Sequence, residues 1–252
     1  MKFHLNPVEY IETNEPLDIS LQLENTEKNV RAWYVDLPQF ETVRANGFIG
    51  SVKEGGGVNF RNIFFNPHGH GTHTECLGHI TPKIYSINDS LKNYFFNALV
   101  VSIEPENVKT KDGANDLIIT ESQMDGLLKN VQTEALIIRT LPNLDKKKSL
   151  NYSSTNPAYL DVNCIHSIRK SGVQHLMIDL PSVDREEDGG ALAFHHAFWE
   201  VPENPQFQKT ITELIFVDDS IVDGNYILEL QVASFKNDAS PSRPVLYKII
   251  KG

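Results

Sequence analysis

A strand–helix–strand alternation in the middle of the chain constrains the fold more than any other feature. Residues 120–131 combine a capping sequence with apolar residues at helical spacing, and residues 135–140 are a short apolar run typical of a buried strand. Residues 157–170 begin with proline and precede Gly172, which predicts a second helix. Residues 173–180 again favour a strand. Because such segments are joined by crossover connections, they predict a parallel unit.

Further strands flank this unit without intervening helices. They are predicted at residues 17–23, 58–65, 93–104, 210–216, 224–230 and 243–249. Strands of this kind favour antiparallel pairing, so the predicted class is mixed α/β. Residues 1–16 are polar and interrupted by proline, and we expect them to lie across the surface. Since no linker divides the sequence, residues 1–252 are predicted to form a single domain.

Composition and charge exclude several classes of protein. The chain is 40% hydrophobic and 22% charged, as ordinary globular proteins are. Its net charge of −10 argues against nucleic acid or an anionic membrane as the main partner. Two distant cysteines provide no disulfide framework, and neither a leader sequence nor a long apolar segment stands out. These features favour a cytoplasmic enzyme acting on a small molecule.

Residues 64–79 have the composition of a metal site. They hold four of the nine histidines, together with one glutamate, and imidazole is the commonest metal ligand. In an extended strand His73 and Glu75 point to the same side, about 7 Å apart along the backbone. Strict alternation places His68 and His70 on the opposite side, unless a bulge or turn at a neighbouring glycine brings one of them round. The glycines also allow a close approach of backbone and ligand.

Two later segments supply further candidate ligands. Residues 193–199 form a predicted helix with adjacent His195 and His196, which point about 100° apart, so only one of them can face an ion squarely. The pattern alone does not choose between them. Glu213 lies on an apolar strand, where a buried carboxylate is costly unless it is paired or binds metal. The alternative for Glu213 is an outward-facing strand residue.

The pattern Gly71-Thr72-His73-x-Glu75-x-x-x-His79 resembles the signature of the cyclase-like metal hydrolases, which include kynurenine formamidase and isatin hydrolase. The resemblance implies that His73 and Glu75 bind metal and that His79 is the catalytic histidine. The first metal histidine of the family falls on Gly69, so this ligand is missing unless His68 or His70 replaces it. Glutamate also stands here in place of the family's aspartate, and leucine in place of its proline.

The resemblance extends from about residue 17 to the C-terminus. It selects His195 over His196 and assigns a metal-binding role to Glu213. It places Trp33 and Tyr34 in the substrate pocket and puts Asp184 on a loop bordering the active site. The implied fold is an α/β domain of the swivelling β/β/α type, and the implied assembly is a homodimer or homotetramer.

The expected ligands are therefore His73, Glu75, His195 and Glu213, with His68 as a further candidate. Mixed imidazole and carboxylate ligands favour zinc, or alternatively manganese. His79 is expected to act as general base and acid in the hydrolysis of a formamide, anilide, cyclic amide or lactone in a small aromatic substrate.

Two other classes remain compatible with these residues. Two histidines and one carboxylate also suit a non-haem iron oxygenase, although that chemistry commonly occupies an all-β barrel. With glycine at position 69, the chain is alternatively a binding module that has lost catalysis.

Overall fold

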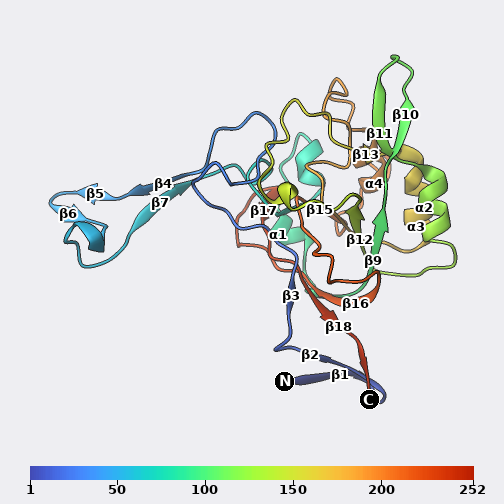
Figure 1. Ribbon diagram of the computed structural model, residues 1–252, viewed down its shortest axis with the longest axis horizontal. Helices are drawn as coiled ribbons and strands as arrows, with labels where there is room; N and C mark the ends of the chain where they lie inside the picture. Colours follow the sequence, from blue (N-terminus) through green and yellow to red (C-terminus); the bar gives the residue numbers. More distant parts are fainter.

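A mixed sheet of nine strands runs through the body of the protein (Figure 1). The computed structural model describes residues 1–252. In spatial order the strands are β17 (Ala239–Pro241), β8 (His73–Glu75), β15 (Thr210–Glu213), β14 (His175–Ile178), β12 (Ala135–Thr140), β9 (Phe95–Ile103), β16 (Gly224–Glu229), β18 (Val245–Lys248) and β3 (Leu17–Asp18). The four central strands β15, β14, β12 and β9 are parallel, and the flanking strands pair antiparallel. This arrangement confirms the predicted mixed α/β class.

The central strands are apolar on both faces, and each face packs against a different set of elements. Leu136 and Ile138 lie in a core cluster with α2 (Glu121–Leu127), α3 (Ile165–Lys170) and α4 (Ala193–Trp199). Ala135 and Ile137, which alternate with them, face a second cluster that includes Ile87 of α1 (Ile87–Ser90). Helix α2 begins at the predicted cap, where Thr120 and Gln123 form a reciprocal capping box.

The predicted helix over residues 157–170 is wrong in its first half. Tyr159–Leu160 forms the short strand β13, which pairs parallel with Ile118 and Ile119. Asp161 then caps a short 3-10 turn, Val162–Cys164, and α3 begins only at Ile165. Because residues 159–160 pair with a neighbouring strand, the helix begins later than Pro157 had indicated.

The N-terminal segment is mostly exposed, but it contains strands that the prediction did not include. β1 (Lys2–Asn6) and β2 (Glu9–Glu12) form a three-stranded sheet with β19 (Ile250–Lys251). The two termini consequently lie close together in Figure 1. The strand expected at residues 17–23 is reduced to β3, since Leu21 donates its backbone N–H to Thr72 near the site.

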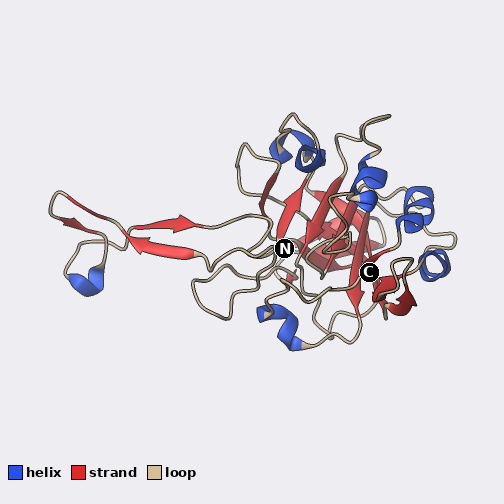
Figure 2. Ribbon diagram, turned by 90° about the horizontal axis from the view of Figure 1, so that it is seen from above, coloured by secondary structure: helices blue, strands red, loops and turns tan.

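A long two-stranded arm projects from the body (Figures 1 and 2). It consists of β4 (Gln39–Thr42) and β7 (Arg61–Phe64), and its tip holds β5 (Arg44–Ala45), β6 (Phe48–Ile49) and a 3-10 turn, Val52–Glu54. The strand predicted at residues 58–65 is thus one side of this arm.

The remaining elements complete the body. They are the hairpin of β10 (Glu106–Lys109) and β11 (Asn115–Ile119) and the 3-10 turns Leu77–Ile80 and Asp145–Ser149. No helix has the length and apolar character needed to cross a membrane.

Candidate metal centre

Strand β8 lies between β15 and β17 and carries the first two ligand candidates. His73 and Glu75 are buried and on the same side of the strand, and β15 places Glu213 directly opposite His73. The Nε2 atom of His73 lies 3.4 Å from Oε2 of Glu213. Ligand atoms of these three residues come within 4.8 Å of one another, a spacing that can hold a metal ion. Glu213 is therefore inward-facing, not the solvent-exposed strand residue of the alternative interpretation.

Helix α4 adds His195 to this cluster. Its Nε2 atom lies 3.0 Å from Oε1 of Glu75 and 3.8 Å from Oε1 of Glu213. His196 points elsewhere, because its Nδ1 atom lies 3.2 Å from the carbonyl oxygen of Val201. Of the two adjacent histidines, only His195 reaches the cluster.

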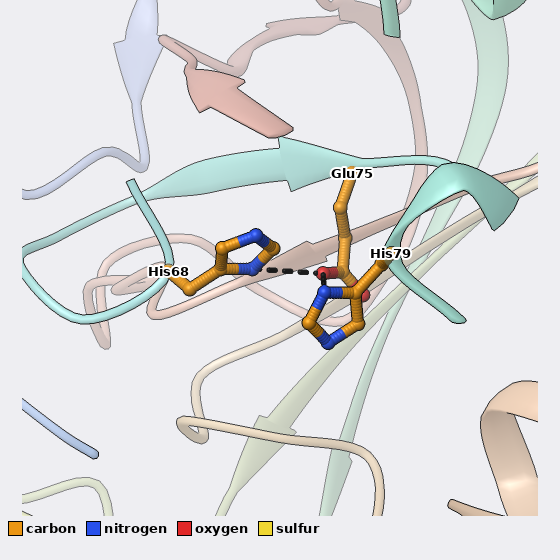
Figure 3. A group of neighbouring side chains, drawn as sticks. All are labelled: His68, Glu75 and His79. Atoms are coloured by element: carbon orange, nitrogen blue, oxygen red, sulfur yellow. Dashed lines mark ion pairs between the residues drawn. The ribbon is translucent and has the colours of Figure 1, made fainter. Parts of the chain in front are cut away.

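His68 takes the place left by Gly69 (Figure 3). A turn at residues 67–69 brings its ring round, so that Nδ1 lies 3.1 Å from Oε2 of Glu75. A Cβ atom at position 69 would lie 2.8 Å from a Val35 methyl group and 3.1 Å from the Ala32 carbonyl oxygen, so the family's histidine position has no room for a side chain. His70 is not part of the cluster, since its ring contacts the backbone of Asn66 and Asp36.

His79 borders the cluster from the 3-10 turn Leu77–Ile80 (Figure 3). Its Nδ1 atom lies 3.8 Å from Oε2 of Glu75, and its ring stacks on that of His68 with centroids 4.3 Å apart. The side chain is 31% exposed, unlike the buried side chains of His73 and Glu75. His79 therefore lies where a bound molecule can reach it.

Two buried atoms in this cluster, Nε2 of His73 and Oε2 of Glu75, make no hydrogen bond of good geometry. Their polar neighbours include Oε2 of Glu213, 3.4 Å from the first atom, and Nδ1 of His68, 3.1 Å from the second. A buried polar atom without a partner is costly, and native proteins rarely retain one without a reason. A cation between imidazole and carboxylate would satisfy both atoms, so the residues present fit a metal.

Neighbouring charges shift the pKa values of the site residues in opposite directions. Burial alone would raise the pKa of Glu75, but the imidazoles of His79, His195 and His68 hold it well below its ordinary value. Burial opposes protonation of His195, yet its contacts with Asp184 and Glu75 raise its pKa to about 10. Burial likewise opposes protonation of His68, and Asp238 and Glu75 raise its pKa to about 10. Protons on the histidines thus balance the negative charge of the carboxylates, and a divalent cation can take the place of these protons.

Asp238 is a member of the site that the sequence did not reveal. Its Oδ2 atom lies 2.9 Å from Nε2 of His68 and 3.5 Å from Nδ1 of His79. It precedes β17, and no motif surrounds it. The only available signal was its nearness in sequence to Ser240-Pro241-Ser242-Arg243, a segment similar to a Ser-Pro-x-Arg segment of the family.

A cavity of about 380 Å³ opens onto the cluster. Its walls include Trp33, His68, His79, His195 and Glu213. Tyr34, the other predicted pocket residue, is 62% exposed and directs its hydroxyl to Glu186.

Asp184, a predicted substrate contact, is turned away from this cavity. Its carboxylate accepts the Nδ1–H of His195 at 2.6 Å and the backbone N–H groups of Phe194 and His195. The structure thus places Asp184 against His195 and Phe194 and not among the residues that line the cavity.

Backbone strain also gathers around the site. Trp33, Leu192 and Leu214 have φ values of 59°, 42° and 53°, in the left-handed region that side-chain-bearing residues rarely adopt. Trp33 and Leu192 line the cavity, and Leu214 follows Glu213. Such conformations concentrate at functional sites.

A mixed α/β fold with a buried His/Glu cluster able to hold a cation defines the class of protein. The chain belongs to the putative cyclase family, whose family model matches residues 17–185. No curated protein sequence matches it.

Solved structures share its fold. One described as a potential metal-dependent hydrolase with cyclase activity is 13% identical, with a TM-score of 0.62, over 92% of this chain and 97% of that one. An isatin hydrolase bound to the product analogue thioisatinate is 13% identical, with a TM-score of 0.61, over 94% and 93%. Isatin hydrolase A from Ralstonia solanacearum is 11% identical, with a TM-score of 0.62, over 94% and 92%.

Proposed function

We propose that the protein is a metal-dependent hydrolase that cleaves an amide-like bond in a small aromatic substrate. The observation that carries this proposal is the pair of buried atoms that make no hydrogen bond, Nε2 of His73 and Oε2 of Glu75. They lie in a cluster whose other members His68, His195 and Glu213 line a cavity. Membership of the putative cyclase family and the shared fold of structures described as metal-dependent hydrolases support it.

The proposed ligands are His73, Glu75, His195, Glu213 and His68. Imidazole and carboxylate together suit zinc, with manganese as the alternative. A bound divalent ion of this type supplies a water of lowered pKa and polarises a carbonyl group. Asp184 fixes the ring of His195 by accepting its Nδ1–H, so that Nε2 faces Glu75.

His79 is the proposed proton carrier. Its ring is partly exposed at the cavity wall, where it can take a proton from water and return it to the leaving nitrogen or oxygen. The Nδ1 atom faces Glu75 and Asp238, and Figure 3 shows the second ring nitrogen directed away from Glu75.

The cavity supports a small substrate with an aromatic ring. Its volume of about 380 Å³ lies near the lower end of ligand sites, which span roughly 300–1,000 Å³. Trp33 provides an apolar wall, and two structures of the same fold are described as isatin hydrolases. The proposed substrates are therefore formamides, anilides, cyclic amides or lactones carrying one or two rings.

Metal content and hydrolysis together test this proposal. Protein stripped of metal and reloaded with zinc or manganese is assayed on formanilide, isatin, an aryl cyclic amide and an aryl lactone. Stoichiometric metal with hydrolysis of at least one compound is expected. Stoichiometric metal without hydrolysis of any compound contradicts the catalytic part, and absence of binding by both ions contradicts the whole proposal.

We also propose that the protein works as a homodimer or homotetramer in which the arm, residues 39–64, packs on a second copy. A two-stranded ribbon is marginally stable alone, and this one exposes Phe48, Phe60, Ile63 and Phe64. The arm carries three basic and two acidic side chains, whereas the chain has a net charge of −10. Its charge therefore complements an acidic body of the same chain.

A further inference from the structure

We propose that Asp238 is a positioning residue that fixes the proton arrangement of both His68 and His79. Its carboxylate lies beside two stacked imidazoles, 2.9 Å from Nε2 of His68 and 3.5 Å from Nδ1 of His79. The inference rests on the proposed function for its catalytic meaning, but the geometry itself does not depend on it.

The backbone holds Asp238 firmly in place. Its carbonyl oxygen accepts the N–H of Cys76, and the neighbouring Asn237 carbonyl accepts the N–H of Ile87. The next residue, Ala239, pairs with Glu75 in the sheet. The carboxylate of Asp238, 15% exposed, is thus carried by a strand edge that is already tied to β8.

For His68, this contact determines which nitrogen faces the cluster. The carboxylate accepts the proton of Nε2, so the proton that a cation would replace is the one on Nδ1, which lies 3.1 Å from Oε2 of Glu75. Metal-binding histidines commonly donate their second ring N–H to a carboxylate in this manner. Asp238 therefore lies outside the ligand set, on the far edge of the His68 ring.

For His79, the same carboxylate supplies the partner that a general base needs. An acceptor beside Nδ1 retains the proton there, which leaves Nε2 as the free base. A nucleophile-activating base is typically oriented by a third group in this way. Asp238 thus positions both the proposed ligand His68 and the proposed proton carrier His79.

Histidine tautomers test the proposal directly. Protein labelled with nitrogen-15 in histidine is examined by NMR at mildly alkaline pH, with His68→Gln and His79→Gln variants to assign the signals. The His79 signal is read in both the metal-free and the zinc-loaded protein, so a failure of metal binding is distinguished from a failure of this proposal. We expect the proton of His79 on Nδ1 and, with zinc bound, that of His68 on Nε2.

Asp238→Ala should convert His79 to a mixture of tautomers and lower kcat by about 10- to 100-fold, with KM within about twofold. Asn237→Ala, which removes a side-chain bond from the same segment, should leave the tautomers unchanged. A proton on Nε2 of His79 in the unmodified protein overturns the proposal. So does a loss of zinc affinity in Asp238→Ala as large as the loss in His68→Ala, because that result would make Asp238 a ligand and not a positioning residue.

Discussion

Nδ1 of His195 lies 2.6 Å from Oδ2 of Asp184, while Nε2 of the same ring faces Glu75 at 3.0 Å. The carboxylate that orients the ring also accepts two backbone N–H groups at the start of α4. Asp184→Asn should therefore lower zinc affinity by about 10- to 100-fold, because an amide orients the ring less firmly. It should also cost about 1–2 kcal/mol of unfolding free energy, because hydrogen bonds to an ionised acceptor contribute more than those to a neutral amide. Competition with a chelator and urea titration measure the two effects.

Asp188→Asn is the matched control for this change. Asp188 accepts backbone N–H groups of residues 190–192 on the same loop but makes no contact with His195. It should lower stability without a comparable loss of zinc affinity. Equal affinity losses in the two variants would contradict the orienting role of Asp184.

The position of the first histidine is set by packing around Gly69. His68→Ala should weaken zinc binding by more than about 100-fold, since loss of a ligand exceeds the cost of losing an outer partner. Adding Gly69→His should not restore binding, because a Cβ at position 69 meets Val35 and Ala32. Calorimetric titration with zinc measures the affinities. Restored affinity in the double variant would show that the loop can accommodate the family's histidine.

His79 borders the cluster without belonging to its buried part. His79→Ala should retain metal within about twofold and lose about 10²–10⁴-fold in kcat, the usual contribution of a positioned proton carrier. His196→Ala, whose ring faces the Val201 carbonyl, is the control and should retain turnover. Metal analysis and steady-state kinetics on the substrate found above give the comparison. Full activity in His79→Ala would remove the proton-carrier assignment.

His175 makes the fold sensitive to acid, independently of the candidate metal centre. Burial lowers the pKa of His175 to about 4, while its ordinary value is 6.5. The unfolded chain therefore binds a proton that the folded protein does not, and stability is lost as the pH falls from about 6.5 to about 4. The loss amounts to at most about 3 kcal/mol for this group.

The variant His175→Asn retains a partner for Thr210 and does not titrate. Urea unfolding at several pH values should show a weaker acid destabilisation than in the unmodified protein. His68 and His195, with raised pKa values, act in the opposite direction: their contribution is present at low pH and lost as the pH rises towards about 10. The difference between variant and parent isolates His175, and identical pH profiles would contradict the assignment.

The arm offers a direct test of assembly. Phe60 and Ile63 are 57% and 49% exposed, and burying both against a second copy contributes several kcal/mol. Phe60→Asp combined with Ile63→Asp should raise the dissociation constant of the oligomer by at least about 100-fold. Val222→Asp, an exposed position on the body, is the control. Light scattering measures the mass, and a monomeric parent protein would contradict the proposal.

The parts of the fold that the sequence predicted are those with strong local patterns. The run at 135–140, the capped helix after Thr120 and the alternation of His73 and Glu75 all appear in the structure. The helix start predicted at Pro157 was wrong, because Tyr159 and Leu160 pair with a strand about 40 residues earlier. The strands within residues 1–16 were missed for the same reason, since their partner β19 is distant in sequence.

The candidate site was predictable only where a motif marks it. His73, Glu75 and His79 belong to a recognisable pattern, and His195 was separated from His196 by resemblance to the family. The structure adds the physical reason, which is the bond between His196 and Val201. Position 68 depended on a turn, and Asp238 on strand pairing. The spacing of residues along the chain does not reveal such a turn or such a strand pairing.

The contact between His68 and Asp238 joins residues 170 positions apart. Contacts between residues so far apart form more slowly than helices or hairpins, so we expect this centre to be completed late in folding. A nascent or misfolded polypeptide would therefore lack the complete set of metal-binding side chains. Ion capture would mark the mature conformation, and chelation would be expected to loosen the N-terminal and C-terminal halves from each other.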